Sequence, residues 1–206
     1  MFIPNPQEQK TQIYFGQNNQ SRLKKVILYI LEIIKIVIIS LAIIIPVRYF
    51  LIQPFYVKGA SMEPNFYDHE YLIIDEISYR FNEPKRGDIV VFKYPRDTSQ
   101  YFIKRVIGLP NEKIEILDGK IIVYNKENPS GVVINEIYLE EGLKTPGNQT
   151  VTLGLNEYFV LGDNRFSSYD SRSFGPIYRK LIVGRTWIRG WPFDKIKIFG
   201  APQYNF

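Results

Sequence analysis

The sequence predicts a mainly β domain that is preceded by one N-terminal transmembrane helix. Two observations predict this class. A single long apolar stretch lies near the N-terminus, and the chain after it consists of short runs of strand-forming residues separated by Gly, Pro and Asp. With 206 residues, of which 45% are hydrophobic, the chain is long enough to bury a core. We therefore expect a folded domain tethered to a bilayer.

The apolar stretch runs from Val26 to Val47. It is long enough to cross a hydrocarbon core, which takes about 20 helical residues. Glu32 and Lys35 interrupt it, but they lie three residues apart and can pair on one helix face. The 25 residues before it are too many for the n-region of a signal peptide, and no small-x-small cleavage site follows. We expect an uncleaved anchor rather than a cleaved secretory signal peptide.

Basic residues indicate the orientation of this anchor. Three of the four residues 22–25 are basic, whereas Arg48 and Lys58 are the basic residues that follow the span. The positive-inside rule then places residues 1–25 in the cytosol as a short tail. Residues 48–206 would form an extracytoplasmic domain on the outer side of the cytoplasmic membrane.

Strand-like runs follow Pro54. They are Tyr71–Asp75, Ile89–Tyr94, Tyr101–Ile107, Lys113–Leu117 and Lys120–Tyr124. Asp118-Gly119 separates the last two and predicts a type I′ hairpin turn, because both residues tolerate a positive φ. The polar segment from about Asn125 to Gly147 lacks a clear period. We interpret residues 118–152 as a small β-rich insertion into the main domain.

Composition excludes several kinds of site. The chain has no cysteine, and His69 is its only histidine. Thiol catalysis, disulfides, thiolate metal sites and a zinc site of the HExxH kind are therefore impossible, and we expect no metal and no cofactor. The net charge of +5 comes from 26 basic and 21 acidic residues without any block of like charges, so we expect no nucleic-acid partner.

The first candidate for chemistry is Ser61, shortly after the anchor. Gly59 and Ala60 precede it, and these small residues leave its hydroxyl open to an incoming carbonyl group. Taken by itself, a serine in such a segment is more often an ordinary turn residue.

The second candidate is Lys104, in a run of strand-forming residues. Period-two alternation places Lys104 on one strand face with Phe102 and Val106, and Arg105 on the other. If the face of Lys104 is inward, desolvation lowers the pKa of its ammonium group and makes a neutral amine available as a base. The alternative is a lysine on an edge strand whose charged end reaches solvent.

The third candidate is the polar segment Gly162–Gly175. It is dense in hydrogen-bonding side chains, yet it follows the apolar run Tyr158–Leu161. This combination favours a buried polar network, and the alternative is a turn region with surface ion pairs.

Taken together and in order, four motifs resemble those of type I signal peptidases, the membrane-bound Ser-Lys proteases that release signal peptides from exported proteins. SMEP (61–64) matches the nucleophile motif and RGDIVVF (86–92) the strand motif. YFIKRVIGLP (101–110) matches the lysine motif and GDNRFSSYDSR (162–172) the late polar motif. The resemblance covers essentially the whole chain from the anchor onward, and it implies a signal-peptidase-like β catalytic domain.

The resemblance implies a role for individual residues. Ser61 would be the nucleophile, Lys104 the general base, and Ser168 the residue whose hydroxyl orients the lysine. Four further residues match positions that support the site through ion pairs: Arg105, Asp163, Asp170 and Arg172.

The most informative departure from the enterobacterial form of the motif is Gly59, where that form has a serine that donates its hydroxyl to the oxyanion. Here we expect the main-chain N–H of Ser61, with one further main-chain donor, to bind the oxyanion, because losing a donor costs a few kcal/mol of transition-state stabilisation.

The function implied is cleavage of N-terminal signal peptides from exported preproteins. The expected partners are preprotein signal peptides and membrane lipid, and we expect a monomer near the secretion translocon. Two other classes stay open: a tethered β domain that only binds peptides, and a LexA-like self-cleaving regulator, which would need a DNA-binding domain. A Ser-His-Asp triad would have to use His69, whose acidic, turn-like surroundings indicate a structural or solvated histidine.

Overall fold

The computed structural model describes the backbone at residues 6–50 and 52–204, and the side chains at residues 22–46 and 54–204. The chain divides into two compact units, residues 1–48 and 49–206.

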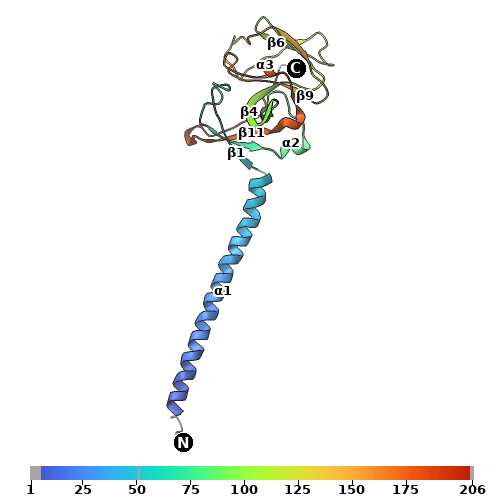
Figure 1. Cartoon of the computed structure of the whole chain (residues 1–206). Helices are drawn as coiled ribbons and strands as arrows, with labels where there is room; N and C mark the ends of the chain where they lie inside the picture. The colour runs from blue at the N-terminus through green and yellow to red at the C-terminus, as the bar shows by residue number, and fades with distance from the viewer. Residues whose placement is uncertain (1–5, 51, 205–206) are drawn as a thin grey trace. The chain divides into compact units, whose positions relative to one another are not determined.

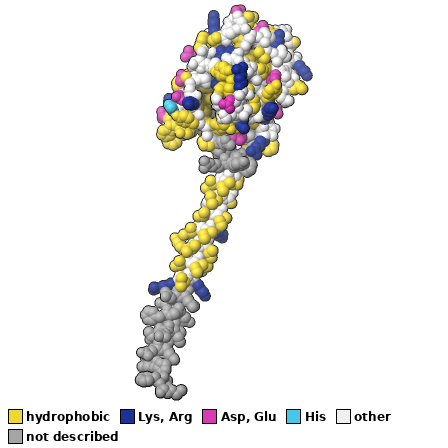
Figure 2. Space-filling model, in the orientation of Figure 1, with side chains coloured by type: hydrophobic (Ala, Val, Ile, Leu, Met, Phe, Trp, Pro, Cys, Tyr) yellow, Lys and Arg dark blue, Asp and Glu magenta, His cyan; other side chains and the backbone are white. Residues whose placement is uncertain are grey.

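The first unit contains the helix α1 (Pro6–Phe50), drawn in blue in Figure 1. Its segment Arg22–Pro46 is 25 residues long and apolar enough to cross a membrane. Every side chain of this segment is exposed, and Figure 2 shows hydrophobic side chains along it with basic ones at its N-terminal end. A helix that is apolar around its whole circumference is typical of lipid surroundings.

The second unit is mainly β, as predicted. In the described part of the chain its main sheet has eight strands, all antiparallel to their neighbours, in the order β1-β2-β11-β3-β4-β9-β10, with β12 against β11. The strands are β1 (Ile52–Tyr56), β2 (Tyr71–Asp75), β3 (Ile89–Tyr94), β4 (Asp97–Gly108), β9 (Glu157–Leu161), β10 (Ile177–Tyr178), β11 (Ile182–Trp191) and β12 (Lys197–Ile198). Short helices lie between them: α2 (Ser78–Phe81), α3 (Ser171–Phe174), η1 (Arg179–Leu181) and η2 (Phe193–Lys195).

A second sheet of four strands follows β4 in the chain, in the order β7-β6-β5-β8. Its strands are β5 (Lys113–Leu117), β6 (Lys120–Tyr124), β7 (Val132–Val133) and β8 (Gln149–Thr152). The turn between β5 and β6 has φ of 52° at Asp118 and 81° at Gly119, so both residues have the positive φ that the expected type I′ turn requires. This sheet begins with β5 at Lys113, which is five residues before the start of the expected insertion at residue 118. Tyr204 packs against the apolar cluster that contains Ile121 and Val123 of β6, whose place Figure 1 marks.

β4 is the strand that positions the site. It pairs with β3 on one side and β9 on the other, so it is a central strand and not an edge strand. Both of its faces are covered. Val106 packs in one apolar cluster with residues of β3 and β9, and Ile107 packs in another with residues of the second sheet. A charged residue at the adjacent positions of β4 is therefore forced into the interior whichever face it lies on.

Candidate active site

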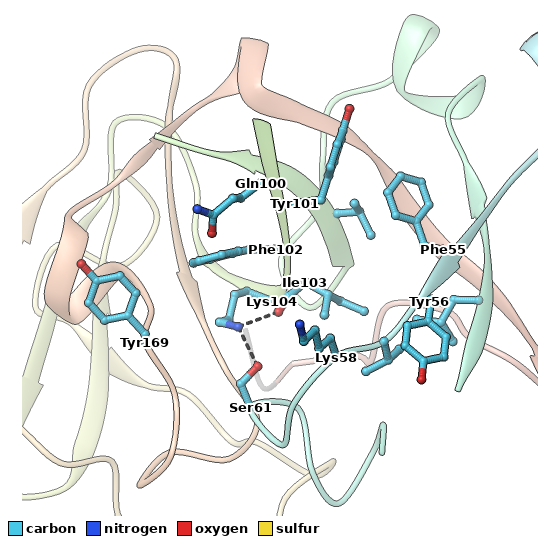
Figure 3. Close-up of a pocket in the computed structure, with 13 residues that line it drawn as sticks. Phe55, Tyr56, Lys58, Ser61, Gln100, Tyr101, Phe102, Ile103, Lys104 and Tyr169 are labelled. Atoms are coloured by element: carbon cyan, nitrogen blue, oxygen red, sulfur yellow. Dashed lines mark hydrogen bonds between the residues drawn. The ribbon is translucent and has the colours of Figure 1, made fainter. Parts of the chain in front are cut away.

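A cavity of about 470 Å³ opens beside Ser61. Figure 3 shows Ser61 and Lys104 in its middle, with aromatic side chains on either side of them. Phe55 and Tyr56 lie on one side, at the end of β1, and Tyr169 lies on the other. A concave, mostly apolar cavity with a few converging polar groups is the usual form of a binding site for a chain segment or a small molecule.

The loop that carries Ser61 is anchored from below. Met62 and Phe66 are buried in an apolar cluster of the main sheet, and the N–H of Phe66 donates to the carbonyl of Met62 at 2.9 Å. Asn164 donates its N–H to the carbonyl of Ser61 and its Nδ2 to the carbonyl of Ala60, both at 3.1 Å. Asn164 thus binds the carbonyls of Ala60 and Ser61, while the side chain of Ser61 lines the cavity.

Lys104 lies within hydrogen-bond distance of Ser61. Its Nζ is 2.7 Å from the Ser61 Oγ, and it donates to the carbonyl of Ile103 at 2.9 Å. The Phe102 ring lies on the same strand face, with its centroid 5.5 Å from the Nζ. In a neutral lysine the amine accepts the hydroxyl proton across the 2.7 Å contact. This is the arrangement in which an amine can activate a serine as a nucleophile.

Burial sets the protonation of this lysine. Lys104 is 4% exposed, and desolvation of its ammonium group lowers its pKa to about 8. The carboxylates of Asp170 and Asp163 act in the opposite direction but more weakly. Both of these carboxylates are already paired with arginines, so the field they exert on the amine is partly cancelled.

Arg105, on the opposite face of β4, forms a buried two-point ion pair with Asp163. Its Nε donates to one carboxylate oxygen at 2.8 Å and its Nη2 to the other at 2.6 Å. Tyr138 stacks on the guanidinium group, 3.7 Å from the ring centroid. This ion pair connects β4 to the polar segment that follows β9.

Asp170 and Arg172 form a second paired group in the same segment. Arg172 donates to both carboxylate oxygens at 2.8 Å, and the N–H of Gly162 donates to the same carboxylate at 3.1 Å. Burial by itself raises the pKa of Asp170, but the hydrogen bonds and the charge of Arg172 outweigh it and hold the pKa below its ordinary value. Asp170 therefore stays ionised and caps α3 through the N–H of Arg172.

Ser168 lies next to the nucleophile loop, but it does not contact Lys104 through a hydrogen bond. A methyl group at Gly162 would come within 2.2 Å of the Ser168 Oγ and 2.4 Å of the Ser61 carbonyl, so Ser168 and Ser61 lie around the same point. Within the described chain the Ser168 hydroxyl is buried without a partner at full hydrogen-bond geometry, but it lies close enough to the Asp170 carboxylate to help lower the pKa of that group. Its orienting role stays a prediction.

The main chain near Ser61 limits the choice of oxyanion donors. The N–H of Gly59 donates to the Asp68 carboxylate at 2.9 Å, so this group is occupied. No hydrogen bond within the described residues uses the N–H of Ser61. Gly59 has φ of 88°, and a methyl group there would meet nothing within 4 Å, so the space beside this residue is open.

His69 lies outside the cavity. Its partners are the hydroxyl of Tyr56 and the carboxylate of Asp68, whose Oδ2 is 3.3 Å from the histidine Nε2. The side chain is 75% exposed. The structure thus brings Ser61 together with Lys104 and not with the histidine.

Sequence reasoning gave no role to three residues that organise this region. Asn164 holds the nucleophile loop, as described above. Asn65 donates to the Asp163 carboxylate at 2.9 Å. Arg165 is 2% exposed and donates to Glu136 and Thr145, which joins the segment between β7 and β8 to the polar segment. For Asn164 and Arg165 the available signal was their place in a hydrogen-bonding segment next to an apolar run, but the partners of all three residues are distant in sequence.

The residues of the described chain include no group of three or more His, Cys, Asp or Glu side chains that could hold a metal ion. The polar side chains that line the cavity include those of Ser61, Lys104 and Lys58.

The chain is similar to known proteins. The family model described as signal peptidase, peptidase S26, matches residues 30–191. A signal peptidase I of Leptolyngbya laminosa is 33% identical over 183 residues, which are 84% of this chain and 85% of that protein. A signal peptidase IB of Staphylococcus aureus is 31% identical over 188 residues, 86% of this chain and 94% of the other. A solved structure of a signal peptidase I from Enterococcus faecalis V583 is 32% identical, with a TM-score of 0.42. The match covers 50% of this chain and 97% of the chain in that structure. The chain therefore belongs to the signal peptidase I family of peptidase S26 and is a serine endopeptidase that cleaves signal peptides.

Proposed function

We propose that the chain cleaves signal peptides from exported preproteins with Ser61 as the nucleophile and Lys104 as the general base, at the outer face of the cytoplasmic membrane. The observation that carries this proposal is the 2.7 Å contact between the hydroxyl and a buried amine inside the cavity. A pKa of about 8 leaves roughly a tenth of the lysine neutral at pH 7.

The reaction begins with the neutral amine of Lys104. It accepts the proton of the Ser61 hydroxyl while the Oγ attacks the scissile carbonyl carbon, which gives a tetrahedral intermediate. The intermediate collapses as the C–N bond breaks, and the lysine ammonium gives its proton to the leaving amine. Water then attacks the acyl-enzyme with Lys104 again as the base, and the proton returns to the Ser61 Oγ as the signal peptide acid leaves.

The oxyanion of the intermediate would be bound by the free N–H of Ser61. The N–H of Gly59 can serve as a second donor only if it gives up the Asp68 carboxylate. Each such donor contributes about 3 to 4 kcal/mol when it is aimed at the developing charge.

The polar segment would position these groups. The ion pairs of Arg105 with Asp163 and of Asp170 with Arg172 support the site from both sides of β4. Ser168 would orient Lys104, because its buried hydroxyl lies beside the nucleophile loop and close to the Asp170 carboxylate. Groups held by their own partners keep a reactive geometry at little entropic cost.

Tethering would bring the site to its substrate. The apolar part of a signal peptide lies in the bilayer, so an enzyme anchored by α1 meets it at a high effective concentration. The basic residues at 22–25 support an N-terminus inside and the β unit outside. Trp187, Trp191 and Phe193 are 41%, 47% and 71% exposed, and such side chains favour contact with membrane lipid.

The test is cleavage of a preprotein by the purified full-length chain in detergent. Ser61→Ala and Lys104→Met should each lower the rate at least about 1,000-fold, because either change removes a group that acts in the chemical step. Ser167→Ala is the matched control, since this exposed serine lies in the polar segment outside the cavity. A product yield from Ser61→Ala equal to that of the wild type would refute Ser61 as the nucleophile.

A further inference from the structure

The cavity continues past Lys104 on the side opposite β1. There its wall consists of Gln100 and Phe102 from β4, and of Tyr169 from the polar segment (Figure 3). None of these side chains carries a charge. Neither the motifs nor the proposed chemistry gives Tyr169 a role.

Tyr169 is held firmly although it is 46% exposed. Its hydroxyl lies 3.2 Å from the hydroxyl of Tyr94, and its ring meets the Phe174 ring edge-on at 5.5 Å between centroids. Tyr94 is itself stacked on Phe102, with a centroid distance of 4.7 Å and an angle of 14° between the rings. An aromatic side chain fixed in this way forms a preorganised wall, which can bind a ligand without ordering itself first.

The chemistry assigns this side of the cavity to the leaving group. Lys104 must pass its proton to the leaving amine, so the nitrogen of the scissile bond lies close to the Lys104 Nζ. Figure 3 shows Phe102 and Tyr169 on the Lys104 side of Ser61, and Phe55 and Tyr56 on the opposite side. The acyl part of the substrate then extends toward β1, and the first residue after the cut passes Phe102 and Tyr169.

We propose that Tyr169, positioned by Tyr94, is a specificity-determining residue for the first residue after the scissile bond, and that it favours an apolar side chain there. The inference rests on the proposed function. An apolar side chain loses water contact against the Phe102 and Tyr169 rings, whereas a carboxylate would give up hydration against these two uncharged rings.

The test uses matched preproteins that differ only in the first residue after the cut, with leucine or aspartate at that position. The quantity measured is the ratio of kcat/KM for the leucine substrate to that for the aspartate substrate. Because both substrates meet the same enzyme, this ratio does not depend on how much of a variant is folded. A hydrophobic contact of this size discriminates by about tenfold.

Tyr169→Ala should bring the ratio close to one, and Tyr169→Phe should keep most of it because the ring stays in place. Tyr178→Ala is the control, since Tyr178 is 51% exposed and lies outside the cavity; its ratio should equal that of the wild type. The inference is overturned if the wild type does not prefer leucine, or if Tyr169→Ala lowers kcat/KM for both substrates by the same factor. A wild type that cleaves neither preprotein would overturn the proposed function and this inference with it.

Discussion

Raising the pH should activate the enzyme as the buried amine of Lys104 loses its proton. Desolvation lowers the pKa of this lysine to about 8, against an ordinary value of about 10.4. Only the neutral amine can accept the Ser61 proton, so kcat/KM should follow the neutral fraction of the free enzyme.

The size of the effect follows from that pKa. With a pKa of about 8, roughly 1% of the lysine is neutral at pH 6 and half at pH 8. We therefore expect kcat/KM to rise about fifty-fold between pH 6 and pH 8, and less than about twofold from pH 8 to pH 9. A solvent-exposed lysine would instead give a rise of about tenfold per pH unit up to pH 9 and beyond.

The assay is the initial rate of preprotein cleavage by the full-length chain in detergent, measured at substrate concentrations well below KM. His69→Ala is the control, because it removes the one histidine of the chain, which lies outside the cavity. Its profile should match that of the wild type. A rate that is flat between pH 6 and 8, or that still climbs tenfold per unit at pH 9, would show that a buried lysine is not the base.

Three further predictions concern the surroundings of this pair. Gly162→Ala should abolish most activity and destabilise the fold, because the added methyl would lie 2.4 Å from the Ser61 carbonyl oxygen in the nucleophile loop. Gly200→Ala is the control, since a methyl group there meets nothing within 4 Å, and it should change neither the cleavage rate nor the thermal unfolding temperature. Asp163→Asn should lower the free energy of unfolding by about 3 to 5 kcal/mol, since it leaves the Arg105 charge buried and unpaired; an unchanged denaturation midpoint would contradict this. Lys104→Met should stabilise the protein at pH 7 by roughly 3 kcal/mol, because it removes an ammonium group whose burial is unfavourable. The pKa of Lys104 is lower in the folded protein, so the unfolded chain binds more protons between about pH 8 and 10.4, and the stability of the wild type rises with pH over that window. Urea unfolding at pH 7 and pH 10 should find this rise only in the wild type.

Local patterns predicted the elements that local interactions control. The runs Tyr71–Asp75 and Ile89–Tyr94 have the bounds of β2 and β3, because alternation and β-branched residues are legible over five or six positions. The Asp118-Gly119 turn has the expected positive φ angles. The apolar stretch from Val26 is equally legible, since its length and composition require no partner in the chain.

The candidate site was legible in part. Motif order pointed to Ser61 and Lys104, whose side chains are in contact although 43 positions separate them. The same reasoning gave no role to Asn164, whose side chain holds the carbonyl of Ala60 from 104 positions away. A single sequence contains the hydrogen-bonding capacity of such a residue but not the identity of its partner.

The sequence by itself predicted the type of chemistry, because its four ordered motifs resemble those of Ser-Lys proteases and the absence of cysteine excludes a thiol nucleophile. Tertiary structure alone decided how that chemistry is supported. Pairing of β4 between β3 and β9 buries Lys104 and so lowers its pKa, and the approach of Asp68 to Gly59 occupies one main-chain donor. Burial and long-range pairing depend on which strands become neighbours, and this is a property of the packed chain rather than of any short stretch of it.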